Sequence, residues 1–337
     1  MNYKHFIGID VSKSWLDFTV MEKNQILLYK RIENNVKSIK AFFKGLKVFE
    51  GYQLCDTLVC MEHTGIYNNH LLNHLNELKA NVCLESGLQI KQSSGLKRGK
   101  NDKIDSERIA LYAYKNCEEI KLWQPKRNLL IRLHHLTALR NRLLNVLKQL
   151  QTPLKESAGF VNKKDLGQTK SFCKSSIAAA TKDLKKLNDQ IKSLIKADPE
   201  LNRLFNLITS VTGVGTVTAT EMIITTNEFK SITCHKKYAC YSGVAPFEHR
   251  SGSSIRGKTR VSSMGNKNVK KLLHLAALSA SICKGDMKNY FDRKVAEGKN
   301  KMLILNAIRN KIIARVFACV KQNRLYEKNY QNDLFYP

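Results

Sequence analysis

Short apolar runs alternate with helically spaced apolar residues through the first 120 positions of the chain. The runs have the length of buried strands, whereas the other segments repeat an apolar residue every three or four positions. Three strands precede a helix, and strands and helices alternate after it, which predicts a mixed α/β sheet with helices on its faces. The expected strands are 5–10, 16–21, 25–29, 57–61 and 81–84, and the expected helices are 34–49, 67–78 and 104–114.

A different pattern begins near Lys126. Leucines recur at spacings of three, four and seven between Leu129 and Leu154, with Arg and Lys among them. This spacing predicts a long amphipathic helix with coiled-coil character, interrupted near Pro153. A second amphipathic helix follows at about 184–195. The two helices could form a hairpin folded back on itself or an arm that pairs with another subunit, and periodicity does not separate these alternatives.

The last third of the chain, from about Leu201, is predicted to be mainly helical with glycine-rich interruptions. These are a turn at 211–215 and a loop at 250–264, followed by apolar helices near 269–283 and 302–320 and by a polar tail that we expect to be poorly ordered. The expected domains are therefore an α/β domain at 1–125, a helical coiled-coil region at 126–200, a mainly α domain at 201–325 and a tail at 326–337.

The positive charge of the chain is unevenly placed. The net charge is +29, but residues 1–120 hold 17 Lys and Arg against 14 Asp and Glu, which leaves 40 against 14 for residues 121–337. A balanced first part followed by a strongly basic remainder indicates a catalytic part and a part that binds a polyanion, of which nucleic acid is the expected one. Charge added only for solubility would not need this asymmetry.

Several classes of protein are disfavoured by the composition. No apolar run approaches the roughly 18 residues of a membrane span, and the first residues lack the apolar core of a signal peptide, so we expect a cytoplasmic, nucleoid-associated protein. Nine scattered cysteines argue against a disulfide framework. Cys234, His235 and Cys240 lack a second ligand pair at zinc-finger spacing, which disfavours a zinc site.

Four acidic residues are the candidate catalytic groups. Asp10 and Glu62 each end an apolar strand, and Asp102 and Asp105 lie three positions apart at the start of a helix, on one face. If the two strands are neighbours and the helix packs across their ends, all four carboxylates converge. Their repulsion would then be relieved by divalent cations, and all-oxygen ligands favour Mg²⁺ or Mn²⁺ over zinc.

Each of these acids also has a simpler structural explanation. Asp102 could cap the helix and Asp105 could interact with the positive end of its dipole. Asp10 and Glu62 could be turn residues where strands end. The combination of two strand-end acids with a D-x-x-D helix start favours the metal site, in which a pair of ions would serve phosphoryl transfer.

Two segments near the C-terminus are candidates for nucleic-acid binding. Gly213 and Gly215 resemble a helix-hairpin-helix turn, after which a helix presents free N–H groups to a phosphate, although a plain interhelical turn explains them equally well. The segment 250–260 combines small hydroxyl residues and glycines with four basic residues, which suits an extended phosphodiester. Its serines could merely donate hydrogen bonds to phosphate, because no base is adjacent in sequence. The basic candidates are Arg250, Arg256, Lys258, Arg260, Lys267 and Lys270.

The acidic motifs resemble those of a known family. Residues 6–13 (FIGIDVSK), 62–67 (EHTGIY) and 101–110 (NDKIDSERIA) look like the N-terminal motifs of the DEDD insertion-sequence transposases and recombinases. These are relatives of the Piv DNA invertases, and the family includes bridge-RNA-guided recombinases. The resemblance implies a RuvC-like, RNase H-type fold with Asp10, Glu62, Asp102 and Asp105 as metal ligands. Ser106 stands where the family usually has alanine.

Residues 205–280 resemble the second conserved region of the same family. The matching features are the Gly-Val-Gly turn, the run YSGVAP at 241–246, the run RSG at 250–252 and the run MGN at 264–266. In that family a serine of this loop attacks DNA and becomes a phosphoserine, which implies Ser251, with Ser253 and Ser254 as alternatives. Lys270 stands where an arginine is common, which keeps the charge and loses bidentate geometry.

The resulting hypothesis is a transposase or site-specific recombinase that cuts and rejoins donor and target DNA. The resemblance further implies a structured guide RNA and a homo-oligomer, a dimer or tetramer formed through the helical region, which could complete the site across an interface. The alternatives are a metal-dependent, RuvC-like junction-resolving nuclease, in which water attacks, and a non-catalytic nucleic-acid-binding protein whose acids are structural.

Overall fold

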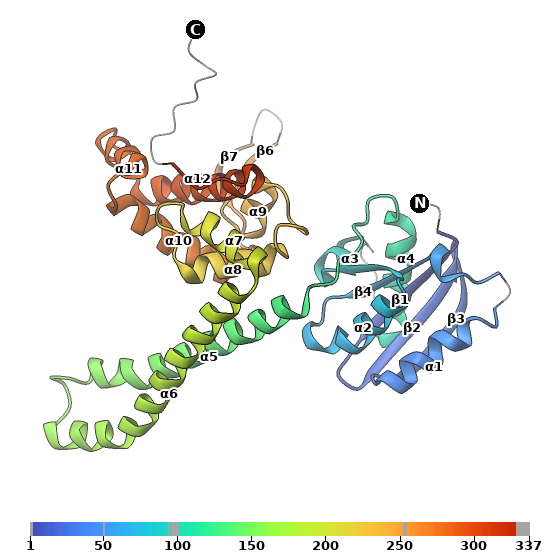
Figure 1. Ribbon diagram of the computed structural model, residues 1–337. Coiled ribbons are helices and arrows are strands. Elements are labelled where there is room, and N and C mark those ends of the chain that lie inside the picture. Colours follow the sequence, from blue (N-terminus) through green and yellow to red (C-terminus); the bar gives the residue numbers. More distant parts are fainter. Residues whose placement is uncertain (1–2, 50, 94, 96–100, 252–254, 328–337) are drawn as a thin grey trace, which may run out of the picture. The chain divides into compact units, whose positions relative to one another are not determined.

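The chain folds into two compact units. The computed structural model describes residues 3–49, 51–93, 95, 101–251 and 255–327. Contacts within the chain divide it into a first unit, residues 1–125, and a second unit, residues 126–337. The first unit contains a five-stranded sheet and the second consists mainly of helices (Figure 1). Each unit is described by itself below.

The first unit is built on one mixed sheet with strand order β3-β2-β1-β4-β5. β1 pairs antiparallel with β2, which pairs antiparallel with β3, while β4 runs parallel to β1 and β5 parallel to β4. This arrangement is a mixed sheet, as the order of the apolar elements predicts. The strands are β1 (His5–Val11), β2 (Trp15–Glu22), β3 (Gln25–Glu33), β4 (Thr57–Glu62) and β5 (Asn81–Glu85).

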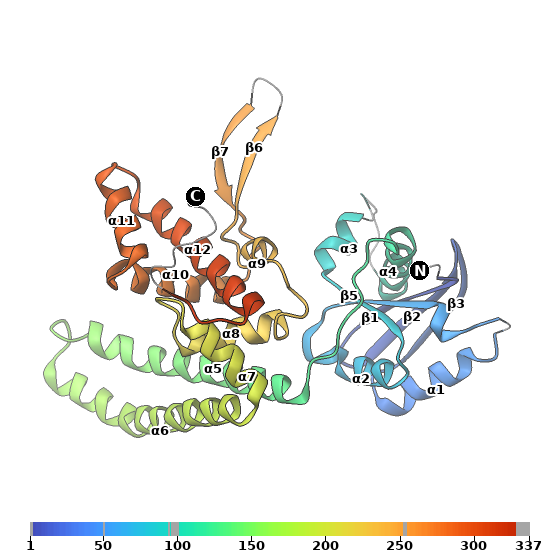
Figure 2. The same ribbon diagram turned by 45° about the horizontal axis from the view of Figure 1, so that its top comes forward.

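Helices cover both faces of this sheet (Figure 2). One core layer joins α1 and α2 to the strand residues of one face, including Ile7, Ile9 and Phe18. The other layer joins α4 to Phe6, Leu58 and Cys60 on the opposite face. These layers confirm the predicted α/β fold, a mixed sheet with helices packed on both faces. The helices are α1 (Val36–Leu46), α2 (Asn69–Glu77), α3 (Gly87–Ser93) and α4 (Asp102–Asn116), with short 3₁₀ helices at Leu54–Asp56 and Gly65–Asn68.

A glycine of β1 lets α4 lie directly on the sheet. A Cβ atom at Gly8 would come within 2.2 Å of the backbone of Ser106 and of Ala110, so only glycine fits at this contact. Ser106 is fully buried, and its hydroxyl is 2.7 Å from that of Thr19 on β2. The serine that stands in place of the family's alanine therefore has a hydrogen-bond partner inside the core, which removes the cost of burying it.

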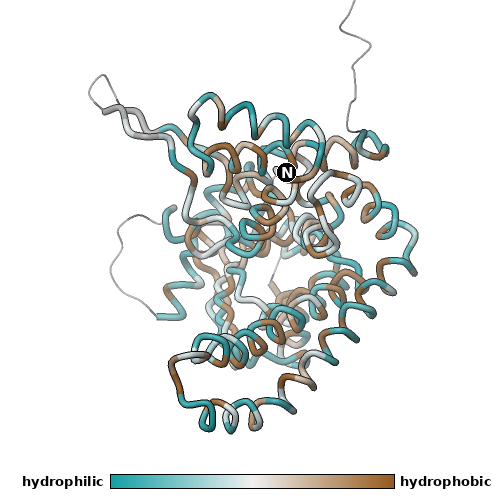
Figure 3. The backbone as a smooth tube through the Cα atoms, turned by 90° about the vertical axis from the view of Figure 1, so that its left-hand side faces the viewer, coloured by the Kyte–Doolittle hydropathy of each residue, from teal (hydrophilic) through white to brown (hydrophobic). Residues whose placement is uncertain are grey.

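The second unit begins with two long helices, α5 (Asn128–Glu156) and α6 (Lys163–Ala197), which lie side by side as an antiparallel hairpin (Figures 1 and 2). Figure 3 shows hydrophilic and hydrophobic stretches alternating along this hairpin, in the lower part of the view. The predicted interruption at Pro153 is wrong, because α5 continues through Pro153 to Glu156. Proline removes one hydrogen bond near the end of the helix, and the following turn still closes through Ser157.

Six further helices and a hairpin complete the described part of the second unit around one core. The predicted loop at 250–264 is wrong in part, because an antiparallel two-stranded hairpin pairs Pro246 with Val261 and Ser251 with Ile255. Extended pairing suits the β-branched residues Thr259 and Val261, whereas the glycines and serines of the segment had suggested an open loop. The elements are α7 (Pro199–Thr209), α8 (Thr216–Thr226), α9 (His235–Tyr241), β6 (Pro246–Ser251), β7 (Ile255–Val261), α10 (Lys267–Ile282), α11 (Asp286–Ala296) and α12 (Lys301–Gln322).

The described part of the predicted tail is bound to the second unit. The Tyr326 hydroxyl donates to a carboxylate oxygen of Asp286 at 3.0 Å, and its backbone N–H donates to the Ser210 hydroxyl at 2.9 Å. The remaining tail positions, 328–337, lie outside the described residues. Among the helices that the structure describes, none combines the length and apolarity needed to cross a membrane.

Candidate functional site

Two strand ends and one helix start meet at one edge of the first unit's sheet. β1 and β4 run parallel with Ile9 opposite Met61, so Asp10 and Glu62 end neighbouring strands. α4 packs against β1, β2 and β4 and carries Asp102 and Asp105 in its first turn. The cap of α4 is Asn101, whose side chain accepts from the Ile104 N–H at 2.8 Å, so Asp102 is not the capping residue. Its carboxylate is available for another role.

The electrostatics of Asp10 show that the four carboxylates share one environment. The pKa of Asp10 is raised to about 6, first by burial and then by the negative charges of Asp105, Asp102, Asp17 and Glu62. A carboxylate in this position is destabilised by its neighbours, and a bound cation would relieve the repulsion. The raised pKa of Asp10 therefore indicates that the other three predicted acids lie close enough to repel it.

The carboxylates do not close around a common point. Among the residues described, no group of three or more His, Cys, Asp or Glu side chains is arranged to hold a metal ion, and this includes Cys234, His235 and Cys240. Two of the four acids are instead paired with arginines. Asp102 accepts from the guanidinium of Arg31, and Asp105 accepts from Arg108 at 3.0 Å. Asp10 and Glu62 form no ion pair within the described part of the chain.

The donors at this edge nevertheless fit a hard divalent cation. All four groups offer carboxylate oxygens, which magnesium and manganese prefer. Gly87, at the start of α3, lies against Glu62, because a Cβ atom built there would come within 2.1 Å of Glu62 Oε1. The missing side chain leaves space for this carboxylate at the strand end. Asp10, Glu62, Asp102 and Asp105 are therefore the residues that would hold a metal here.

Sequence analysis missed a fifth acidic residue beside the site. Asp17 on β2 lies directly opposite Asp10 in the β1–β2 pairing, and it is only 2% exposed. It accepts from the Tyr29 hydroxyl and, at 3.0 Å, from Nε of Arg31, both on β3. A charged residue between Leu16 and Phe18 in an apolar strand was the available signal, because such a group needs a buried partner.

In the second unit, the two glycines of the predicted phosphate-binding turn have different surroundings. Gly213 has a φ of +88°, and a Cβ atom there would come within 2.3 Å of the Ala276 carbonyl on α10. This close packing gives Gly213 a structural role in an interhelical turn. Gly215 has open space around it and precedes α8, whose first turn no side chain caps among the described residues.

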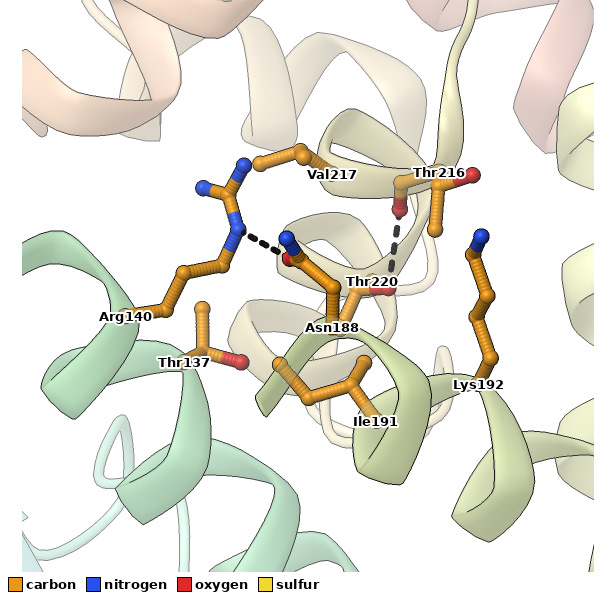
Figure 4. A pocket seen from close by; sticks show the side chains of 8 residues that line it. All are labelled: Thr137, Arg140, Asn188, Ile191, Lys192, Thr216, Val217 and Thr220. Atoms are coloured by element: carbon orange, nitrogen blue, oxygen red, sulfur yellow. Dashed lines mark hydrogen bonds between the residues drawn. The ribbon is translucent and has the colours of Figure 1, made fainter. Parts of the chain in front are cut away.

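A basic pocket adjoins the start of α8 (Figure 4). This cavity of about 230 Å³ is bordered by Arg140 of α5, by Asn188 and Lys192 of α6, and by the first turn of α8. Arg140 Nε donates to Asn188 Oδ1 at 2.8 Å, and no acidic side chain lines the cavity. Two cations beside free helix N–H groups suit a phosphate. The sequence pattern showed the basic residues of α5 and α6 but not which of them would meet α8.

The predicted serine loop lies on the β6–β7 hairpin. Arg250 and Ser251 belong to β6, and Arg256 and Lys258 to β7, by their backbone pairing. Arg260 is exposed on β7, Lys267 is exposed at the start of α10 and Lys270 is partly buried one turn later. Ser253 and Ser254 lie outside the described residues.

A charge-balanced α/β unit with acids clustered at one sheet edge, followed by a basic, mainly helical unit, is the arrangement that the resemblance to the DEDD transposases implies. Residues 7–157 match the family model of the DEDD transposase of the IS110 type, and residues 205–292 match the model described as "Transposase IS116/IS110/IS902 family". The chain therefore belongs to the IS110 family of DEDD transposases.

Two relatives span almost the whole chain. The pilin gene-inverting proteins of Moraxella bovis and Moraxella lacunata are each 26% identical over 331 residues, which is 96% of this chain and 98% of theirs. A 43.6 kDa protein of insertion element IS110 from Streptomyces coelicolor is 30% identical over 153 residues, 45% of this chain and 36% of its own. RuvC of T. thermophilus in complex with a Holliday junction substrate aligns with 36% of this chain and 100% of its own, at 17% identity and a TM-score of 0.28.

Membership in this family makes the chain a transposase with a DEDD domain, a DNA-processing enzyme. This type of domain implies dependence on divalent metal ions in general. The transposase class that the resemblance of the acidic motifs implied is thereby confirmed.

Proposed function

We propose that the protein cuts DNA and rejoins it to a second DNA end, with Ser251 as the nucleophile and with Mg²⁺ or Mn²⁺ held by Asp10, Glu62, Asp102 and Asp105. The observation that carries this proposal is the family match of both units in one chain: acids gather at one edge of the first unit, and the second supplies a basic, serine-bearing hairpin. The relatives named for gene inversion and for an insertion element favour rejoining over simple hydrolysis.

The chemistry is a pair of transesterifications. The Ser251 oxygen forms a bond to phosphorus while the bond from phosphorus to the leaving DNA oxygen breaks, and the serine proton ends on that leaving oxygen. A hydroxyl of the second DNA end then attacks the same phosphorus and returns the proton to Ser251. The bound metal supplies charge stabilisation for the phosphoryl group. The phosphoserine linkage conserves the energy of the phosphodiester bond between the two steps.

The acids and the serine belong to different units, so the reaction requires them to meet on the DNA. We propose that this occurs in a homo-oligomer, a dimer or tetramer, formed through the α5–α6 region. Exposed apolar side chains on this hairpin support the proposal, since Leu139 is 40% and Phe172 is 76% exposed. Light scattering of the full chain with DNA measures the subunit number.

The basic residues of the second unit would bind the nucleic-acid backbone. The candidates are Arg250, Arg256, Lys258, Arg260, Lys267 and Lys270, together with Gly215 and, through the turn it shapes, Gly213. Part of this basic surface would hold a structured guide RNA that specifies donor and target. Copurification of a defined RNA with the full chain, and its requirement for recombination, test this part of the proposal separately.

The experiment that tests the nucleophile is trapping of a protein–DNA adduct. The purified protein is incubated with Mg²⁺ and a DNA carrying its recombination site, quenched under denaturing conditions and mapped by mass spectrometry. We expect a phosphoserine linkage at residue 251, and we expect Ser251→Ala to abolish strand cleavage. Cleavage that survives in Ser251→Ala, Ser253→Ala and Ser254→Ala alike would identify a metal-dependent nuclease in which water attacks.

A further inference from the structure

Arg31 pairs with a buried acid of the first unit and with an acid of the candidate metal site. These partners are Asp17 and Asp102. The Nε of Arg31 donates to both oxygens of Asp17, at 3.0 and 3.2 Å, and its Nη2 donates to Asp102. One guanidinium therefore holds two carboxylates, of which Asp17 is buried and Asp102 is exposed. This planar fork suits such double pairing, which a lysine could not reproduce.

Three features of β2 and β3 hold Arg31 in position. The register of the sheet places it directly opposite Asp17 on the neighbouring strand. Asp17 is held in addition by the hydroxyl of Tyr29, also on β3. The Arg31 guanidinium carbon lies 5.9 Å from the centre of the Trp15 ring, within the range of a cation–π contact. Arg31 is thus anchored to the sheet independently of Asp102.

The contact with Arg31 and the binding of a metal ion make competing demands on the Asp102 carboxylate. A carboxylate that accepts from a guanidinium has fewer free lone pairs for a metal, and the positive charge beside it opposes a second cation. The two bonds of Arg31 are separable, because Nε can stay on Asp17 while Nη2 releases Asp102.

We propose, on the basis of the metal-dependent function proposed above, that Arg31 is a positioning residue that competes with the divalent cation for Asp102. It neutralises part of the acidic site before the metal binds, and it raises the cation concentration at which Asp102 becomes a ligand. Asp17 serves as the fixed anchor of the guanidinium in both states. Arg108 pairs with Asp105 within the first turns of α4, three positions apart, whereas Arg31 joins two strands of the sheet to α4.

The test is a Mn²⁺ titration of the full-length protein, followed by the loss of the free-ion signal in electron paramagnetic resonance. We expect Arg31→Gln to bind Mn²⁺ about tenfold more tightly than the wild type, because a competing charge is removed. Tyr29→Phe is the matched control: it removes another partner of Asp17 without touching Asp102 or the charge, and its affinity should equal that of the wild type. Thermal unfolding of each variant reports whether the fold is kept.

Arg31→Lys provides a second variant if Arg31→Gln does not fold. Its single ammonium can pair with Asp17 or Asp102 but not with both, so we expect Mn²⁺ binding about threefold tighter than wild type. Unchanged or weaker binding in the folded arginine variants would overturn the role of Arg31 and leave the metal site standing. A wild type that binds no Mn²⁺, or whose binding survives Asp10→Asn, would overturn the proposed metal site and the role of Arg31 together.

Discussion

The two units of this transposase differ in the surroundings of their carboxylates. In the first unit, carboxylates gather at one end of the sheet, where burial and mutual repulsion raise the pKa of Asp10 to about 6. In the second unit, two carboxylates share one arginine: Arg127 donates to both oxygens of the partly buried Asp198, at 2.8 and 2.9 Å, and also pairs with the buried Glu228. This pairing lowers the pKa of Asp198 to about 2.

The contrast separates acids that stabilise a fold from acids that are kept for function. A carboxylate with a well-placed arginine contributes to folding, whereas a carboxylate among other carboxylates costs stability until something else binds. Arg127 and Arg31 both join two acids, but Glu228 is only 1% exposed in its side chain and Asp102 is 57% exposed. The first arrangement is structural, and the second can be opened by a competing cation.

The largest expected effect is a loss of DNA cleavage without a loss of DNA affinity when an acid of the candidate metal site is replaced. Asp10→Asn and Asp102→Asn should each lower strand cleavage by about a thousandfold, because a lost metal ligand removes several kcal/mol of charge stabilisation. DNA affinity, carried by the basic unit, should change less than about twofold. Cleavage and filter-binding assays on the same preparations measure both, and Glu77→Gln, an exposed acid on α2, is the matched control. Parallel losses of cleavage and affinity would break the division of roles.

Removing the arginine that pairs with the acids of the second unit should lower the stability of that unit. Arg127→Ala leaves Glu228 buried beside Lys230 alone, and we expect the second unit to lose about 3 kcal/mol of unfolding free energy. Calorimetry of the full chain should show its transition at lower temperature while that of the first unit is kept. Arg203→Ala removes an exposed pair with Glu200 and should cost less than about 1 kcal/mol. Equal losses from the two substitutions would contradict the structural role of Arg127.

The stability of the first unit should depend on pH through Asp10. Because its pKa is higher in the folded state than the ordinary 3.8, ionisation destabilises the fold, and stability is lost as pH rises from about 4 through about 6. In the presence of a chelator, Asp10→Asn should therefore stabilise this unit at pH 7.5 by up to about 2 kcal/mol, and by less at pH 5. Melting curves at the two pH values measure this. A variant less stable than wild type at pH 7.5 would show that the carboxylate is structural.

The smallest expected effect concerns the basic pocket beside α8. Arg140→Gln and Lys192→Gln should each weaken nucleic-acid binding a few-fold and lower the slope of log K against log salt by about one. Lys37→Gln, an exposed lysine of the first unit, is the control and should leave the slope unchanged. Equal slopes in all three variants would remove this pocket from the nucleic-acid-binding surface.

Periodicity and chain order were enough to predict the fold of the first unit. The apolar strands that end on Asp10 and Glu62 are neighbours, as predicted, and parallel strands bring their ends to one edge of the sheet. The hairpin at 246–261 was missed because its glycines and serines outweighed the β-branched residues that favour pairing. Pro153 was given too much weight, because a helix tolerates proline near its end when neighbours support it.

The partners of the site residues were beyond sequence analysis. Nothing in the local pattern shows that Arg31 reaches 71 positions along the chain to Asp102, or that Ser106 meets Thr19 inside the core. Such pairs are set by strand register and by the close approach of α4 at Gly8, which are tertiary properties. The nucleophile remains a prediction from the family resemblance.

The most direct test of the central claim is the location of Mn²⁺ by anomalous scattering in crystals of the full-length protein. The account predicts an anomalous peak within coordination distance of Asp10, Glu62 and an α4 carboxylate, with Arg31 released from Asp102 and still bound to Asp17. Bound manganese at another place, or an ordered site in which these carboxylates keep their arginine partners and face no ion at saturating Mn²⁺, would contradict it.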